Sequence, residues 1–487
     1  MKSLIYSRLK NTSLLITSLF FCGIGGCSSE HENSSAPNVL LISVDDLNTF
    51  VGCLGYQHVQ TPNIDRLASQ GVLFANAHAQ APLCGPSRAS VMTGLRPSTT
   101  GIYGQIDDDN ISAVFPAENQ ITFMPQYFSD HGYFTMGVGK IFHNHAPENL
   151  FSKSGGRVKG FGPKPEGNTY FKWNEKGTST DWGAFPEDDR DMPDYQSAQW
   201  AIEQLSKQYN QPFFLAVGFL RPHVPWYVPD KWFDKYDKDK IVTPPYYPED
   251  FDDLPEIARK IDELPMFPST SWAMETGEWE NIIHAYLACV TFVDYYIGQL
   301  LDALEKSQYA ENTIVVLWSD HGYRLGQKGK FAKHCLWQEG THVPLIFKGP
   351  GIPEGKKINS PSELLSIYPT LLELCNLPEN DTNEGESLLP LIKNTDVQWN
   401  FPAITTYGFG NHSIVTDRYR FIQYEDGSEE LYDHHSDPNE WHNIAQIPGN
   451  EQLLKELRKQ IPETNQPWSE FSHFTVNEYF RTTSASK

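Results

Sequence analysis

The clearest pattern along the chain is a series of short apolar runs separated by longer stretches with helical spacing. The first run, at residues 38–44, is rich in β-branched side chains and ends directly in Asp45 and Asp46. Continuous apolar runs of this length are typical of strands buried on both faces of a parallel sheet. Further strands are predicted from residue 72 onward and at residues 133–138, 212–219, 313–318 and 344–347.

Helices are predicted between these strands. One begins at Thr61, which we expect to be the N-cap, has Pro62 in its first turn and is closed by Gly71. The other long helical segments are residues 195–207, 279–306 and 362–375. Strands that alternate with helices predict an α/β domain whose largely parallel sheet is covered on both faces.

The pattern changes after about residue 400, where short alternating segments at residues 413–416, 419–424 and 430–432 precede a helix at 451–460. This predicts a small antiparallel sheet with one helix. A chain of 487 residues has room for two domains. We therefore expect a catalytic domain at residues 37–395 and a small C-terminal α/β domain at 396–487. Residues 155–194 and 228–271 are rich in Pro, Gly, Asp, Lys and aromatics and are interpreted as surface loops.

The N-terminus has the features of a targeting segment. Basic residues precede an apolar stretch at residues 13–22, which is shorter than the roughly 20 residues of a membrane-spanning helix. A box ending in Gly26 and Cys27 is followed by polar residues. We interpret residues 1–26 as a lipoprotein signal peptide, Cys27 as the lipid site and residues 27–36 as a polar linker; a plain secretory peptide is the alternative. The protein is then exported and anchored to a membrane at the periplasm or cell surface.

Charge and cysteine usage narrow the function further. The formal net charge is −23 and no Lys/Arg run is present, which argues against a nucleic-acid partner. Seven cysteines are present, and Cys53, Cys289, Cys335 and Cys375 lack Cys-x-x-Cys spacing. A zinc site is therefore not favoured, while disulfides stay open.

The most specific motif is Cys84-Gly85-Pro86-Ser87-Arg88. On the pentapeptide alone, a buried structural cysteine before a helix is a serious alternative. The motif gains weight from other segments along the chain, which are Asp45-Asp46, residues 139–143, residues 221–225, Ser319-Asp320-His321-Gly322 and Lys333.

In the order and approximate spacing of these segments the chain resembles the type I sulfatase family, and residues 38–390 are most similar to its iduronate-2-sulfatase branch. The resemblance implies an alkaline-phosphatase-like α/β fold and oxidation of Cys84 to formylglycine by a separate maturating enzyme. It also implies calcium held by Asp45, Asp46, the modified Cys84, Asp320 and His321. His321 departs from the asparagine that many sulfatases have, and an imidazole is an unusual calcium ligand, so magnesium is the alternative ion.

The resemblance further assigns roles to five side chains. Arg88 and Lys140 hold the formylglycine hydrate, and His143 takes the proton that triggers sulfate release. His223 and Lys333 contact sulfate, with His223 as the donor that protonates the leaving oxygen. The chemistry is consistent with this, because a hydrated aldehyde offers two hydroxyls on one carbon, whereas a serine would remain as a stable sulfate ester.

We therefore expect a carbohydrate sulfatase that acts in polysaccharide degradation. The candidate substrates are ulvan, with its 3-sulfated rhamnose, and glycosaminoglycan uronate 2-sulfate. The alternatives are a formylglycine-dependent phosphodiesterase or phosphonate hydrolase and a non-catalytic sugar-binding lipoprotein. The aromatic residues considered for a sugar-stacking platform are Trp182, Trp226, Tyr227 and Trp337.

Overall fold

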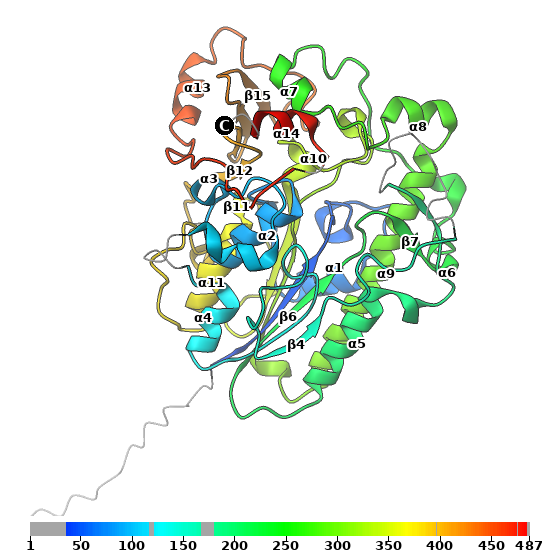
Figure 1. Cartoon of the computed structure of the whole chain (residues 1–487), viewed down its shortest axis with the longest axis vertical. Coiled ribbons are helices and arrows are strands. Elements are labelled where there is room, and N and C mark those ends of the chain that lie inside the picture. The colour runs from blue at the N-terminus through cyan, green and yellow to red at the C-terminus, as the bar shows by residue number, and fades with distance from the viewer. Residues whose placement is uncertain (1–35, 116–120, 167–179, 396, 475, 485–487) are drawn as a thin grey trace, which may run out of the picture. The chain divides into compact units, whose positions relative to one another are not determined.

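A nine-stranded mixed sheet runs through the computed structural model, which describes residues 36–115, 121–166, 180–395, 397–474 and 476–484 (Figure 1). Eight strands follow the order β10-β2-β9-β8-β1-β6-β3-β4, and β11 pairs with β2. All neighbours are parallel except that β9 is antiparallel to both β2 and β8. The strands are β1 (Asn38–Val44), β2 (Val72–His78), β3 (Phe134–Gly139), β4 (Lys153–Gly156), β6 (Phe213–Phe219), β8 (Thr313–Ser319), β9 (His342–Lys348), β10 (Lys356–Ile358) and β11 (Ser362–Glu363).

The core lies on both faces of this sheet. In β1, Leu40, Ile42 and Val44 pack on one face, while Val39 and Leu41 pack on the other. The strand is buried throughout, which explains its continuous apolar sequence. Helices α1 (Pro62–Ser69), α5 (Pro193–Leu205) and α9 (Trp279–Glu305) cover the first face, and α2 (Cys84–Thr93), α4 (Met124–Asp130) and α11 (Ile367–Leu374) cover the second (Figure 1).

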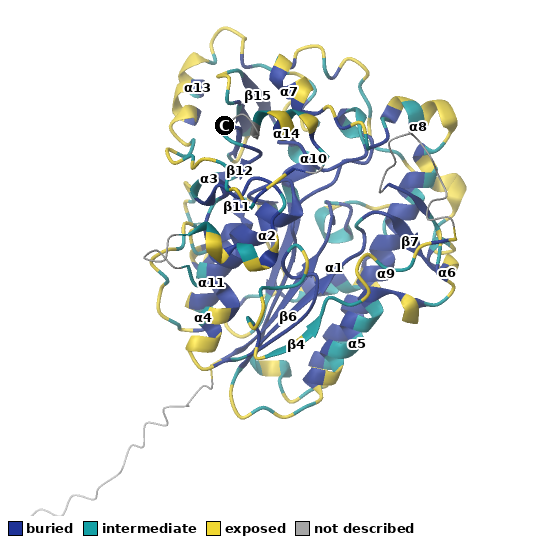
Figure 2. Ribbon diagram, in the orientation of Figure 1, coloured by how far each residue is buried: buried dark blue, intermediate teal, exposed yellow. Residues whose placement is uncertain are grey.

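Helix α9 is the longest helix among the described residues. Its 27 residues are long and apolar enough to cross a membrane, but 78% of its most apolar window is buried inside the protein. It packs against α1 and α5 and shows as a largely buried helix in Figure 2. The hydrophobicity of α9 is therefore explained by its place in the core.

A second, antiparallel sheet is formed near the C-terminus by β12 (Ala403–Thr406), β13 (His412–Val415), β14 (Tyr419–Gln423) and β15 (Glu429–Asp433). Helix α13 (Glu451–Arg458) covers it through Leu454 and Leu457. The predicted antiparallel sheet with one helix is confirmed, although β12 was not predicted. The domain boundary at residue 395 stays a prediction.

The remaining elements are short. Strand β5 (Trp182–Ala184) pairs in parallel with β7 (Trp226–Val228). The other α-helices are α3 (Pro97–Thr100), α6 (Asp230–Phe233), α7 (Glu256–Ile261), α8 (Thr270–Thr276), α10 (Gln338–Thr341), α12 (Leu389–Lys393) and α14 (Glu478–Ser484).

Some local predictions were wrong. The helix predicted from residue 362 begins at Ile367, because Ser362 and Glu363 pair with β2 instead. Thr61 stands at the N-cap of α1, but its hydroxyl accepts a hydrogen bond from the Gly52 amide at 2.9 Å and caps no helical amide. The signal peptide, Cys27 and nearly all of the predicted linker lie outside the described residues.

Candidate active site

The sheet brings four predicted site segments to one edge. Strand β1 pairs in parallel with β6 and β8, so that Val44 lies level with Phe219 and Ser319. Likewise Gly139, the last residue of β3, lies level with Gly218 of β6. The residues that follow these strands include Asp45, Lys140, His223 and Asp320, and they emerge together at the carboxyl end of the sheet. Ligand sites of open α/β sheets form at this end.

Close backbone packing at this edge depends on glycine. A Cβ on Gly218 would come within 2.2 Å of the Lys140 carbonyl carbon, so a larger residue there would displace Lys140. The backbone of Asp46 has φ +60°, a left-handed conformation that is uncommon for a residue other than glycine. It is held by the Asp46 amide, which donates to Asp320 Oδ1 at 3.1 Å, and by the Tyr286 hydroxyl, which donates to the Asp46 carbonyl at 2.8 Å. Such a conformation is typical of functional sites.

Cys84 is the first residue of α2 and is buried. Its Sγ lies 3.2 Å from His321 Nε2 and 3.0 Å from Lys333 Nζ. Burial by itself would raise the pKa of the Cys84 thiol, but the charges of Lys140, Lys333 and His321 lower this pKa well below its usual range. Residue 84 therefore lies where a negative charge is stabilised.

Arg88, on the second turn of α2, links the carboxylates of Asp45 and Asp320 to nearby backbone carbonyls. Its guanidinium contacts Asp320 Oδ2 at 2.8 Å and Asp45 Oδ1 at 3.4 Å, and it donates to the Ile141 carbonyl at 3.0 Å. Lys140 Nζ pairs with Asp45. Burial would raise the pKa of Asp45, but Lys140 and Arg88 outweigh it and hold this pKa well below its usual range.

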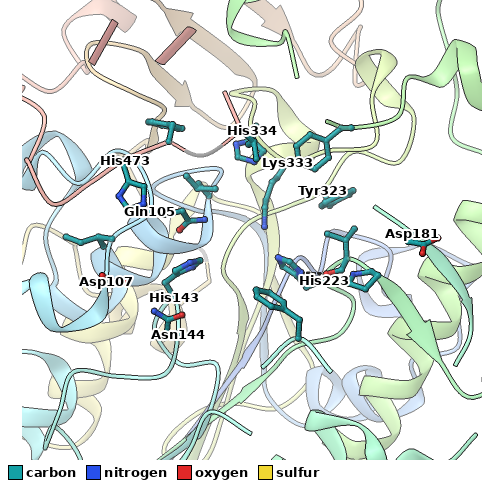
Figure 3. Close-up of a pocket in the computed structure, with 18 of the residues that line it drawn as sticks. Gln105, Asp107, His143, Asn144, Asp181, His223, Tyr323, Lys333, His334 and His473 are labelled. Atoms are coloured by element: carbon teal, nitrogen blue, oxygen red, sulfur yellow. Dashed lines mark hydrogen bonds between the residues drawn. The ribbon is translucent and has the colours of Figure 1, made fainter. Parts of the chain in front are cut away.

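The predicted proton carriers lie around the mouth of the site. Figure 3 shows Lys333 reaching between His143 on one side and His223 on the other. These three side chains line a cavity of about 650 Å³, a volume typical of small-molecule sites. Nδ1 of His223 lies 2.5 Å from the Val224 carbonyl, and its Nε2 lies 4.0 Å from Asp46 Oδ2. His143 lies close enough to Cys84 to contribute to the lowered pKa of its thiol. The structure thus gathers all ten predicted site residues in one place; their individual roles stay predictions.

The same cluster fits a metal ion. Single ligand atoms of Asp45, Cys84, Asp320 and His321 lie within 4.8 Å of one another. Asp46 Oδ2 is buried and has no hydrogen-bond partner in the described part of the chain. Three carboxylates suit a hard cation. Nδ1 of His321 lies 3.0 Å from the Gly322 carbonyl, so this nitrogen carries the proton of the neutral ring and leaves the Nε2 lone pair facing the cluster.

The aromatic side chains proposed for sugar stacking are buried. Trp182, Trp226 and Trp337 do not line the cavity, whereas Tyr227 does but is 0% exposed. The cavity wall instead includes Gln105, Phe161, Lys164 and His473, the last of which lies in the predicted C-terminal domain. None of these residues was singled out from the sequence. Phe161 falls in residues 155–194, which were interpreted as a surface loop, but no sequence signal located that loop at the site.

The five cysteines within the described residues are free thiols. They are Cys53, Cys84, Cys289, Cys335 and Cys375. No disulfide therefore joins any of the described segments around the site.

Comparison with known proteins gives three findings. The family model described as sulfatase matches residues 37–377, and a model described as the C-terminal region of N-sulphoglucosamine sulphohydrolase matches residues 326–467. The chain is 54% identical over 457 residues to a sulfatase of Formosa agariphila, covering 91% of this chain and 90% of the relative. It is 36% identical over 414 residues to human iduronate 2-sulfatase, covering 74% of this chain and 73% of the relative. A solved structure in complex with its substrate D-glucosamine-2-N,6-O-disulfate shares the fold, with a TM-score of 0.69, 23% identity and coverage of 87% of this chain and 96% of the other.

Proposed function

The chain belongs to the sulfatase family and hydrolyses sulfate esters, and on that premise we propose that it acts on carbohydrate sulfates through a formylglycine made from Cys84. The observation that carries the proposal is the position of Cys84 Sγ, between the Lys333 ammonium and the His321 imidazole. An oxidised residue 84 would meet the positive charges of Lys140 and Lys333, which favour the anion of a hydrate over the neutral hydrate.

The hydrated aldehyde would supply two hydroxyls on one carbon, one that attacks sulfur and one whose deprotonation expels sulfate. Lys140 and Lys333 supply permanent positive charge near this position, which would stabilise the added negative charge of the sulfuryl group. Arg88 acts mainly by holding Asp45 and Asp320 in place, since its donors already meet these carboxylates and backbone carbonyls.

The two histidines are suited to different proton transfers. His223 is fixed through Nδ1 by the Val224 carbonyl and presents Nε2 to the cavity, which supports its role in protonating the leaving sugar oxygen. His143 lies close enough to residue 84 to contribute to the lowered pKa of the thiol there, and its Nδ1 is buried without a partner in the described residues. A base near residue 84 would be suited to remove the hydroxyl proton whose loss releases sulfate.

We assign calcium to the carboxylate cluster, with Asp45, Asp46, residue 84, Asp320 and His321 as the ligands and magnesium as the alternative. The bound ion would neutralise the carboxylates and acidify the hydrate. Burial raises the pKa of Asp320 even though Arg88 pairs with it, which means that its charge needs further compensation.

The proposal extends to partners and location. The chain needs a formylglycine-generating or sulfatase-maturating enzyme, and its substrates are sulfated polysaccharide fragments, either ulvan or glycosaminoglycan uronate 2-sulfate. We further propose export through residues 1–26 and a lipid anchor on Cys27, on the strength of the sequence alone.

The test is to produce the full chain with and without a maturating enzyme and to analyse the peptide containing residue 84 by mass spectrometry. We expect formylglycine at residue 84 only with the maturase, and hydrolysis of 4-nitrophenyl sulfate in proportion to it. Activity of wholly unmodified protein would contradict the mechanism. Faster hydrolysis of 4-nitrophenyl phosphate or a phosphonate ester would instead support the phosphodiesterase alternative.

A further inference from the structure

One large apolar side chain lies at the mouth of the active site and is not buried. Phe161 is 41% exposed, whereas the other aromatic side chains of Phe and Tyr residues lining the cavity within the described residues are at most 4% exposed. An exposed ring in a cavity wall is available for contact with a ligand that enters the cavity. Its place in the cavity wall indicates that the ligand is the substrate.

The backbone around Phe161 is built to hold the ring in this place. Lys159, Gly160 and Gly162 all have positive φ, and the Gly162 amide donates to the Lys159 carbonyl at 2.9 Å. The Phe161 carbonyl accepts a hydrogen bond from Arg221 Nη2 at 3.4 Å. This tight turn, together with its anchor on a buried arginine, directs the side chain of residue 161 away from the core.

The ring also packs against the predicted proton donor His223 and against Arg157. Its centroid lies 5.2 Å from that of His223 and 4.7 Å from the Arg157 guanidinium carbon. Arg157 in turn donates to the carbonyls of His143 at 2.7 Å and of Asn144 at 2.9 Å. Phe161 is thus connected to both predicted proton carriers, and a sugar in contact with this ring would also be close to His223.

The same loop brings a free cation to the cavity. Lys164 is exposed, lines the cavity and forms no ion pair within the described part of the chain. Lys140 and Lys333, by contrast, already pair with Asp45 and Asp46. On a chain with a net charge of −23, an anionic ligand needs such local positive charge to approach. Lys164 therefore offers a contact for an anionic group other than the sulfate that reacts.

We propose that the loop at residues 157–166 determines substrate specificity, with Phe161 stacking on the sugar that carries the sulfate ester and Lys164 binding a second acidic group on the substrate. That group is a carboxylate or a second sulfate, and matched substrates that lack one or the other distinguish the two. This inference rests on the proposed sulfatase function and adds to it the substrate class, a sugar with more than one negative charge.

The test of Lys164 uses matched substrates. We would compare kcat/KM for sulfated uronate glycosides and ulvan disaccharides with kcat/KM for the same compounds after reduction of the carboxylate to an alcohol, and likewise for sugars with one and two sulfates. The wild-type enzyme should prefer one of the acidic forms by about 10-fold or more, the value of a charged hydrogen bond. Lys164→Gln should bring that ratio close to one through a higher KM.

The control is Lys159→Gln. Lys159 belongs to the same loop and is also exposed, but it lies 3.6 Å from Asp191 and does not line the cavity. This variant should keep the wild-type preference. A wild-type ratio near one, or a preference unchanged in Lys164→Gln, would overturn the role of Lys164.

The stacking role of Phe161 is tested by variants with smaller side chains at this position. Phe161→Ala should lower kcat/KM for the sulfated sugars by about 10-fold, because the stacking contact of the ring is lost, and Phe161→Leu should recover part of the loss. Phe401, which is 46% exposed and lies outside the cavity, provides the control variant Phe401→Ala, which should be unaffected. Equal kcat/KM in Phe161→Ala and wild type would refute the stacking role.

Failure of this inference can be told apart from failure of the proposed function. If all variants hydrolyse 4-nitrophenyl sulfate but show no change in sugar preference, the specificity loop is refuted while the sulfatase assignment stands. If the matured enzyme hydrolyses no sulfate ester, the proposed function itself fails.

Discussion

Two of the buried ionic clusters among the described residues differ in how completely their polar atoms are paired. The active-site cluster contains Asp45, Asp46, Asp320 and the cations around Cys84, and it leaves Asp46 Oδ2 and His143 Nδ1 without partners in the described residues. The C-terminal cluster contains Arg420, Glu440, His434, Lys328 and Asp250.

In the C-terminal cluster, the Arg420 guanidinium and the Glu440 carboxylate have hydrogen-bond partners within the protein. Arg420 Nε lies 2.5 Å from Glu440 Oε1, and the other guanidinium nitrogens donate to Leu336, Ser413, Gln338 and Thr341. The second oxygen of Glu440 accepts from the Gln338 amide at 2.9 Å. Buried charges that are fully paired hold a structure, whereas unpaired polar atoms beside a cavity are available for a ligand. The comparison predicts that changes in the first cluster affect chemistry and changes in the second affect stability.

The largest expected effect is at residue 84. Cys84→Ala should lower turnover by at least about 10³-fold, because no hydroxyl pair can form, while the melting temperature stays close to that of the wild type. Cys84→Ser should be equally inactive, and intact-protein mass spectrometry should find it sulfated after mixing with substrate. Multiple turnovers by either variant would contradict the formylglycine mechanism.

Removal of the metal should affect both activity and stability. Chelation should abolish hydrolysis and lower the melting temperature, because Asp46 Oδ2 is buried without a hydrogen-bond partner in the described residues and burial raises the pKa of Asp320. The lost stabilisation is about 4 kcal/mol if the ion was present at 1,000 times its Kd. Added calcium should restore both, and full activity of exhaustively chelated enzyme would exclude the metal assignment.

The two histidines of the active-site cluster should differ in their dependence on the leaving group. His223→Ala should slow the hydrolysis of sugar sulfates by about 10²-fold or more but affect 4-nitrophenyl sulfate much less, since a good leaving group needs little protonation. His143→Ala should slow both substrates and accumulate sulfate on residue 84. Steady-state kinetics and mass spectrometry check this, and the reverse pattern would mean that the roles are exchanged.

The C-terminal cluster is tested with Glu440→Gln. This change leaves the buried Arg420 charge without its counter-charge and should cost about 3–5 kcal/mol of folding free energy, while the folded fraction keeps its turnover number. Denaturant unfolding measures the loss. The control is Glu456→Gln in the exposed pair with Lys459, which should leave stability close to that of the wild type. A stable Glu440→Gln variant with impaired turnover would remove the distinction between the clusters.

The smallest effect concerns Glu339, beside the C-terminal cluster. Its Oε2 is buried without a partner in the described residues, and burial together with the Glu440 charge raises its pKa from 4.5 to about 7. Because the folded-state pKa is the higher one, this carboxyl stabilises the fold fully below about pH 4.5 and loses that contribution as the pH rises through 7. Glu339→Gln should therefore be more stable than the wild type at pH 8, by on the order of 1 kcal/mol, but not at pH 4. Parallel unfolding curves at all pH values would contradict this.

Strands buried on both faces were predictable because every position along such a strand faces the core, which gives a continuous apolar run in the sequence. Strand β1 was predicted at residues 38–44, where the structure has it. The short edge strands β11 and β12 were missed, since two to four residues are too few to show an alternation of apolar and polar positions that differs from chance. Helix α14 was also missed: it places Phe480 against Tyr407, a contact that no local pattern indicates.

The sequence by itself determined the fold class, the enzyme family and the ten residues that meet at the active site. The side chains of these residues have chemical properties that few other residue types share. They also occur in short motifs whose order along the chain can be recognised in one sequence. The tertiary structure alone decided that Asp46 and Asp320, 274 residues apart, share a hydrogen bond, and that Trp226 is buried while Phe161 is exposed at the cavity. The physical reason is that burial and pairing depend on strand register and on loops packed across the sheet, which are long-range properties that the local sequence does not encode.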